Sequence, residues 1–292
     1  MSLTTESRVA TQCVCCASAD LLRSPAILMP FVADRVFGWK PVVIDASWGL
    51  HTIAPGHAYS ICNSLLCTAC NLLFLDIRFT DQELAALYAD YRGADYVALR
   101  ETYEPGYRER NSRLEVRPSH IDAVEDFLRP FVKLPLRTLD WGGNSGRSTP
   151  FRGPGNTTHV YDISGRPTVE HASAVSLADA RSQPHDLVVC SHVLEHVPFP
   201  LQTLEEIGMA VQAGTLLYIE VPLEELTASE PDPVARLHAK RHWHEHINFF
   251  TPDSMRALIA RAGFVVHAEA RVDIPIDGRI HAMLQFACRL PD

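Results

Sequence analysis

Residues capable of chemistry crowd the stretch RHWHEHINFF, which spans positions 241–250. Three histidines alternate there, and Glu245 separates the last one, His246, from the second. In an extended strand the three imidazoles would share one face, with Trp243 and Glu245 on the other. This pattern is compatible with a metal site, a packed strand edge or an acid–base site, because imidazole titrates near neutrality. A metal is disfavoured, since no nearby carboxylate would share the histidine face.

Cysteines with metal-ligand spacing lie in the first 70 residues. Two C-x-x-C pairs, CVCC and CTAC, supply four candidate ligands: Cys13, Cys16, Cys67 and Cys70. Each such turn presents two thiolates on one side of a loop, and two turns complete the closed tetrahedral shell of structural zinc. Cys15 or Cys62 could replace one of the four, and a set of buried, inert thiols is the alternative. We expect structural zinc.

Length and charge restrict the class of protein. The chain has 292 residues, 47% of them hydrophobic, and a net charge of -9. This predicts a large domain plus a smaller one and argues against nucleic acid as a partner. No apolar run is long enough for a membrane span, and the first residues do not resemble a signal peptide. We expect a cytoplasmic protein that acts on a small molecule or glycan, with a homo-oligomer left open.

Two strands followed by acidic residues predict a nucleotide-type cofactor site. Leu136–Leu139 reads as a strand ending at Asp140, with a glycine-rich turn after it, and the next strand ends at Asp162. Such a turn lets the backbone approach a ligand, and the second acid can accept hydrogen bonds from ribose hydroxyls. An acid beside the turn would repel a pyrophosphate but suits a cationic ligand such as S-adenosylmethionine.

The run DWGGNSG resembles motif I of the class I S-adenosylmethionine-dependent methyltransferases, D-x-G-x-G-x-G. Asn144 replaces the middle glycine, and asparagine tolerates positive φ better than most residues. The segments HDLVVCSHVLEHVPFP, AGTLLYIEVP, TPDSMRALIARAGFVVHAEARV and IHAMLQFACRL resemble the later strands and helices of that family, with an antiparallel last strand. The resemblance implies a doubly wound, Rossmann-like α/β fold with a seven-stranded sheet.

The same resemblance implies a set of cofactor-binding residues. The motif I loop would border the methionine moiety, the acid after the second strand would hold the ribose, a later aspartate would meet the adenine amino group, and the loop after the fourth strand would line the floor near the sulfonium. The set is Asp140, Gly142, Gly143, Asn144, Gly146, Asp162, Asp179, Ser191 and His192. Glu195 and His196 are expected to shape that loop.

A narrower resemblance concerns the substrate. A zinc-binding front domain, a methyltransferase core and a Glu-His pair look like the bacterial sugar C-methyltransferases. This implies His246 as a general base, with Glu245 and either Tyr91 or Tyr96 at the site. Three features depart from that family: Trp243 stands where it has a tyrosine, its serine-rich stretch is missing, and its further C-terminal domain is missing.

The predicted organisation is a zinc-binding domain over 1–78, a helical linker or flap over 79–134, and a methyltransferase domain over 135–292. The tyrosine- and arginine-rich part of the middle segment is either a substrate flap or a solvated linker. The predicted function is methylation of a nucleotide- or glycan-linked sugar or a similar small metabolite. The alternatives are O- or N-methylation of another metabolite, or a non-catalytic binding protein.

Overall fold

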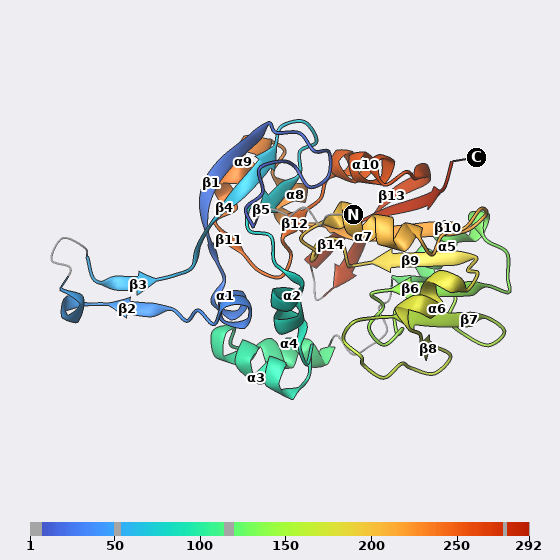
Figure 1. Ribbon diagram of the computed structural model, residues 1–292, viewed down its shortest axis with the longest axis horizontal. Coiled ribbons are helices and arrows are strands. Elements are labelled where there is room, and N and C mark those ends of the chain that lie inside the picture. Colours follow the sequence, from blue (N-terminus) through green and yellow to red (C-terminus); the bar gives the residue numbers. More distant parts are fainter. Residues whose placement is uncertain (1–7, 50–53, 114–119, 277–278, 292) are drawn as a thin grey trace.

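The computed structural model describes residues 8–49, 54–113, 120–276 and 279–291. Two sheets lie side by side, joined by helices (Figure 1). In the described part of the chain no helix is long and apolar enough to cross a membrane.

The larger sheet has seven strands in the order β13-β14-β10-β9-β6-β7-β8. Its parallel part joins β8, β7, β6, β9 and β10, and β14 runs antiparallel to both β10 and β13. This order confirms the predicted methyltransferase sheet and its antiparallel last strand. The strand bounds are Arg137–Trp141 (β6), Thr157–Tyr161 (β7), Ser173–Ala174 (β8), Leu187–Ser191 (β9), Leu216–Leu223 (β10), Val265–Ile276 (β13) and Arg279–Arg289 (β14).

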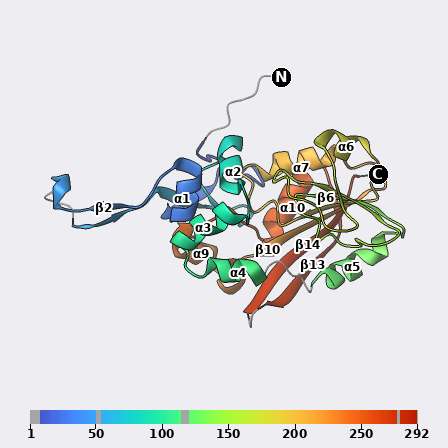
Figure 2. The ribbon, with the colours of Figure 1, turned by 90° about the horizontal axis from the view of Figure 1, so that it is seen from below.

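Helices cover both faces of this sheet, because its central strands are apolar on both sides (Figure 2). Val188 and Cys190 of β9 belong to the core that includes α7 and α10, whereas Leu187 and Val189 belong to the core under α5. The helices are α5 (Ile121–Leu128), followed by the 3-10 turn η2 (Arg129–Phe131), α6 (Leu177–Ser182), α7 (Pro200–Gly208) and α10 (Pro252–Arg261). The proline-containing segment 142–156 between β6 and β7 forms turns and no helix.

The smaller sheet has the order β11-β1-β4-β5-β12. Its front strands are β1 (Leu21–Leu28), β4 (Ile61–Cys67) and β5 (Leu73–Leu75). Its two edges come from far along the chain, since β11 (His242–Trp243) pairs with β1 and β12 (Asn248–Phe249) pairs with β5. The RHWHEHINFF stretch is therefore not one strand. It crosses from one edge of the front sheet to the other.

Short helices fill the space around the front sheet. Thr80 is the N-cap of α2 and forms a capping box with Glu83. Tyr96 and Val97 of α3 are buried, so the tyrosine-rich segment packs into the front core. The hairpin β2–β3 projects from the body as an arm (Figure 1). The bounds are α1 Pro30–Phe37, β2 Val42–Ile44, η1 Ala46–Trp48, β3 Gly56–Ala58, α2 Asp81–Tyr88, α3 Ala94–Tyr103, α4 Tyr107–Arg113, α8 Glu225–Ser229 and α9 Pro233–Ala239.

Candidate active site

The four predicted zinc ligands converge. One Sγ atom from each lies within 4.8 Å of the others: Cys13, Cys16, Cys67 and Cys70. The first C-x-x-C turn precedes β1, and the second joins β4 to β5. Four thiolates at this spacing fit the tetrahedral shell of a structural zinc. Cys15 is buried but is not one of the four convergent cysteines. Cys62 lies near the start of β4, whereas Cys67 ends it.

The loop after β6 takes the conformation that the glycine-rich motif requires. Gly142, Asn144 and Gly146 have φ values of 77°, 55° and 76°, so Asn144 occupies the left-handed region in place of glycine. A Cβ at Gly142 would lie 2.5 Å from Cγ2 of Val193, in the loop after β9. A Cβ at Gly143 would lie 2.3 Å from Cγ of Asp140. Close approach between loops therefore requires glycine.

Two aspartates accept hydrogen bonds from this loop. Asp140 is buried and accepts a hydrogen bond from the hydroxyl of Thr149 at 2.5 Å. Burial raises its pKa to about 6, because desolvation disfavours the carboxylate. Asp162 accepts from the backbone N–H of Asn144 at 2.8 Å and of Ser164 at 2.7 Å. The two acids that the sequence singled out thus frame a single turn.

The remaining predicted cofactor residues differ in their surroundings. Asp179 is part of a helix cap, where its carboxylate accepts from the hydroxyl of Ser176 at 2.6 Å. Ser191 ends β9 and donates to Glu220 at 2.9 Å. His192 follows, with Nδ1 3.2 Å from Glu195 and Nε2 3.4 Å from Glu220.

His192 therefore lies between two buried carboxylates. Burial alone would lower its pKa, but the hydrogen bonds to Glu195 and Glu220 raise it to about 10. Sequence reasoning missed Glu220, although a charged residue inside the apolar strand β10 was the available signal.

His246 meets a carboxylate that the sequence analysis did not identify. Its Nδ1 lies 2.5 Å from Oε1 of Glu224, the residue after β10. Although burial lowers the pKa of His246, the hydrogen bond to Glu224 and the charge of Glu195 raise it above its ordinary value. The signal for Glu224 was its position at the carboxyl end of a parallel strand, where such sheets bind ligands.

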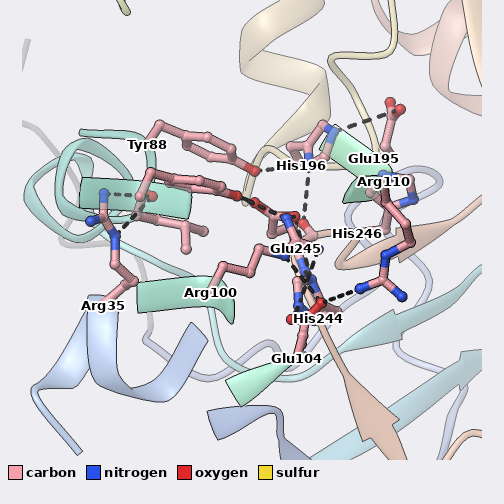
Figure 3. A network of polar contacts seen from close by, with 12 residues as sticks. Arg35, Tyr88, Arg100, Glu104, Arg110, Glu195, His196, His244, Glu245 and His246 are labelled. Carbon is pink, nitrogen blue, oxygen red and sulfur yellow. Dashed lines mark hydrogen bonds and ion pairs between the residues drawn. The ribbon is translucent and has the colours of Figure 1, made fainter. Parts of the chain in front are cut away.

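A second histidine faces His246. The His196 ring lies 4.5 Å from it, centroid to centroid, at an interplanar angle of 82°. Nδ1 of His196 is 2.8 Å from the Tyr88 hydroxyl. The two side chains point toward each other in Figure 3. Burial and the neighbouring His246 lower the pKa of His196 to about 4, so it is neutral near pH 7. Glu195, His196 and His246 each place one potential metal-ligand atom within 4.8 Å of the others.

Glu245 points to a different set of partners. Its carboxylate accepts hydrogen bonds from the Tyr96 hydroxyl and, at 2.7 Å, from Arg100. Figure 3 shows Arg100 beside Glu245. Burial would raise the pKa of Glu245, but the hydrogen bond with His244 and the charge of Arg100 hold it well below its usual range. Tyr91 packs edge-on against Tyr96 at 5.3 Å. The predicted neighbours therefore form a buried network beside His246, and the carboxylate bonded to His246 is Glu224.

The three alternating histidines diverge. His242 is exposed, His244 stacks on Phe31 and pairs with Glu104, and His246 faces His196. A metal site built from all three is therefore wrong, because their rings leave the backbone toward different partners.

A cavity of about 660 Å³ adjoins Glu224. It lies between α8 and the β13–β14 hairpin, and its lining residues are Pro222, Leu223, Glu224, Glu225, Ala228, Ser229, Arg271, Ile280, His281, Ala282 and Met283. Its lining includes Glu224, the carboxylate that bonds His246.

No curated protein matches the chain. Similar solved structures include the glycopeptide N-methyltransferase MtfA complexed with sinefungin, 17% identical over 60% of this chain and 99% of that one, with a TM-score of 0.44. Another is Burkholderia thailandensis 1,6-didemethyltoxoflavin-N1-methyltransferase with bound 1,6-didemethyltoxoflavin and S-adenosylhomocysteine, 17% identical over 67% of this chain and 89% of that one, with a TM-score of 0.45.

The family assignment comes from the sequence match. Residues 110–269, more than half of the chain, match the family described as a methyltransferase domain. The matched range contains the glycine-rich loop, the loop after β9 and the stretch around His246. The chain therefore belongs to the methyltransferase-domain family and is an S-adenosylmethionine-dependent methyltransferase.

Proposed function

We propose that this enzyme methylates a sugar, nucleotide- or glycan-linked, or a similar small metabolite, with His246 as the general base. The observation that carries the proposal is the 2.5 Å contact between His246 and Glu224 at the carboxyl end of β10. The glycine-rich loop follows β6 at the same edge, since β6, β9 and β10 run parallel. Gly142 approaches Val193 closely, which brings that loop next to the residues leading to His196.

In the proposed reaction the cofactor, His246 and Glu224 have separate roles. The cofactor supplies an electrophilic methyl group on a sulfonium. His246 takes a proton from the carbon or oxygen to be methylated, and the resulting nucleophile forms a bond to the methyl carbon as the sulfur–methyl bond breaks. Glu224 orients the imidazole and stabilises its protonated form. The products are the methylated acceptor, S-adenosylhomocysteine and a protonated His246.

We assign the cofactor to the loop after β6 and the residues near it. Asp140, Gly142, Gly143, Asn144 and Gly146 would border the methionine moiety. Asp162 would contact the ribose, Asp179 the adenine, and Ser191 and His192 the sulfonium side. The support is the positive-φ turn, which lets the backbone approach a ligand.

The N-terminal part of the chain would stabilise the structure around the site. Cys13, Cys16, Cys67 and Cys70 would hold a structural zinc. Residues 1–78, 79–134 and 135–292 would form the three units expected from the sequence, with β11 and β12 reaching into the first. Tyr91, Tyr96 and Glu245 would form the wall behind His246, since Glu245 accepts hydrogen bonds from Tyr96 and Arg100 and the Tyr91 ring packs against Tyr96.

The test is a one-methyl mass gain across a panel of nucleotide-sugars in ketone and hydroxyl forms, with S-adenosylmethionine and zinc-loaded protein. His246→Ala should bind S-adenosylhomocysteine like wild type and lose turnover. Full turnover by His246→Ala would remove this residue as the base.

The methylated atom distinguishes two versions of the proposal. A C-methyltransferase should wash solvent deuterium into a ketone acceptor in the absence of methyl transfer, because His246 removes a carbon-bound proton. An O- or N-methyltransferase should leave carbon-bound protons in place. No methylation of any sugar, with cofactor binding intact, would move the acceptor to another class of metabolite.

A further inference from the structure

The loop that carries Glu195 and His196 is held by the front sheet. Residues 194–198 follow β9 of the large sheet, yet four of their backbone carbonyls accept hydrogen bonds from Arg78 or from residues 247–248. Asn248 begins β12 of the front sheet, and Arg78 lies three residues after the end of β5 in the same sheet. A segment of the methyltransferase sheet is thus fastened by a different structural unit.

Asn248 is the centre of this contact. It is 1% exposed, and its amide nitrogen donates to the carbonyls of Leu194 at 2.9 Å and Val197 at 2.8 Å. Its backbone N–H and that of Ile247 both donate to the carbonyl of Glu195, at 3.1 and 2.8 Å. The side chain uses both of its amide hydrogens on this one loop.

Arg78 is the second residue that holds this loop, and we call Arg78 and Asn248 together the clamp. Arg78 is 2% exposed, and its guanidinium donates to the carbonyl of Pro198 at 2.9 Å and to Oδ1 of Asn248 at 3.2 Å. It also donates to the carbonyl of Leu75 in β5. A buried cation bonded to three oxygens orders both sides of the contact, since each bond would cost a desolvated group if it were lost.

The clamp lies directly beside the two facing histidines. His196 lies within the clamped loop, and His246 immediately precedes the clamping residues Ile247 and Asn248. On the other side, β12 pairs with β5, and β5 follows the Cys67–Cys70 turn. The contact path therefore runs from the cysteine cluster through β5 and β12 to the two rings.

We propose that Arg78 and Asn248 are positioning residues that set the approach of His196 to His246, so that the cysteine-supported front sheet controls the geometry of the proton-transfer site. This inference rests on the proposed function for its catalytic meaning. Its geometric content stands independently, because it concerns the histidines and not the acceptor.

The experiment is an NMR titration of the histidine side chains in wild type and Asn248→Ala, with S-adenosylhomocysteine affinity measured on the same samples. The groups facing His196 are the Tyr88 hydroxyl, the Glu195 carboxylate, Glu245 and the His246 ring. Releasing the loop should let His196 separate from His246 and gain solvent. Its pKa should then rise toward the ordinary value by about one unit or more, which is a tenfold change in proton affinity.

Two further variants serve as a conservative substitution and a control. Arg78→Lys retains the charge but cannot make the same set of bonds, so it should shift His196 in the same direction by a smaller amount. Asn63→Ala is the matched control, because Asn63 lies on β4 and bonds Asp76 at 2.6 Å, away from the loop. It should reduce thermal stability and leave the His196 titration unchanged.

Cofactor affinity within about twofold of wild type, together with a shifted His196, would support the inference. An unchanged His196 titration in Asn248→Ala and Arg78→Lys would overturn it and leave these residues a purely structural role. Failure of the sugar panel would overturn the proposed substrate without affecting this result, so the two ideas fail separately.

Discussion

Nδ1 of His246 lies 2.5 Å from Oε1 of Glu224, although 22 positions separate the two residues along the chain. Glu224 follows the fifth parallel strand of the large sheet, whereas His246 lies between two edge strands of the front sheet. The pair exists only because the two sheets meet at this point, and its behaviour can be predicted from its surroundings.

Glu224→Gln should move the acid limb of the pH–rate profile to lower pH. The carboxylate raises the pKa of His246, and a general base works only when neutral, so the rate rises with pH through that pKa. Without the charge the pKa falls, and the plateau rate should fall about tenfold or more because the base is weaker and less well oriented. The measurement is the pH dependence of single-turnover methyl transfer to an acceptor found in the panel. Glu205→Gln on the exposed side of α7 is the control, and an identical profile for both variants would exclude Glu224 from the base.

Gly142→Ala should weaken S-adenosylhomocysteine binding by about tenfold or more, which corresponds to about 1.4 kcal/mol. The added Cβ would lie 2.5 Å from Cγ2 of Val193, and the φ of 77° is unfavourable for alanine. Gly153→Ala is the matched control from the same segment, since its Cβ would meet no atom within 4 Å. Isothermal titration calorimetry distinguishes the two. Equal affinities would mean that this turn does not hold the cofactor.

Cys67→Ser should abolish zinc binding and lower the melting temperature, because the closed thiolate shell loses one of its four ligands. Cys62→Ser should keep the metal, since Cys62 lies outside the convergent group. Cys15→Ser should also keep it, although Cys15 lies close enough to hydrogen-bond with Cys13. Metal content per chain by mass spectrometry checks all three. Loss of zinc from the Cys62 or Cys15 variant would reassign the ligand set.

Glu195→Gln should destabilise the enzyme by about 1–3 kcal/mol at neutral pH, because the half-exposed His192 loses one of its two carboxylate partners and solvent reduces the cost. Although burial raises the pKa of Glu195, its hydrogen bond with His192 and the charges of His196 and His192 lower it to about 2. This stabilisation is therefore present above about pH 4.5 and is lost as the pH falls toward 2.

The alkaline side of the stability–pH profile depends on His192, whose pKa is raised to about 10. Its contribution is complete below pH 6.5 and declines as the pH rises through 10. The urea midpoint of unfolding should fall toward both the acidic and the alkaline end of this pH range in wild type and in the control Glu205→Gln. It should fall much less in Glu195→Gln. A flat difference between wild type and Glu195→Gln at every pH would contradict the assigned charges.

Tyr96→Phe should cost about 1–3 kcal/mol of stability, because Glu245 would lose a buried hydrogen-bond donor. Urea unfolding measures this cost. Tyr103→Phe, whose hydroxyl bonds the half-buried Asp34 at 2.8 Å, should cost less. If Tyr96→Phe kept its stability but lost methyl transfer, the hydroxyl would have a direct catalytic role in place of a supporting one.

The sequence by itself determined the features that depend on local pattern. The Thr80 cap with Glu83 and the glycine-rich turn after β6 follow from capping chemistry and backbone freedom, which are properties of a few neighbouring residues. The antiparallel last strand was expected from the family resemblance. The spacing of the two C-x-x-C turns likewise predicted which four sulfurs converge.

Only the tertiary structure decided which side chains meet across the two sheets. The alternating histidines suggested one strand with a shared face, but β11 and β12 pair with opposite edges of the front sheet, and the segment between them turns His244 and His246 toward different partners. Glu245 was the sequence neighbour of His246, yet Glu224 is its partner in space. Adjacency along a chain does not fix side-chain direction once the backbone leaves a regular strand, and contacts between distant segments depend on how the two sheets pack.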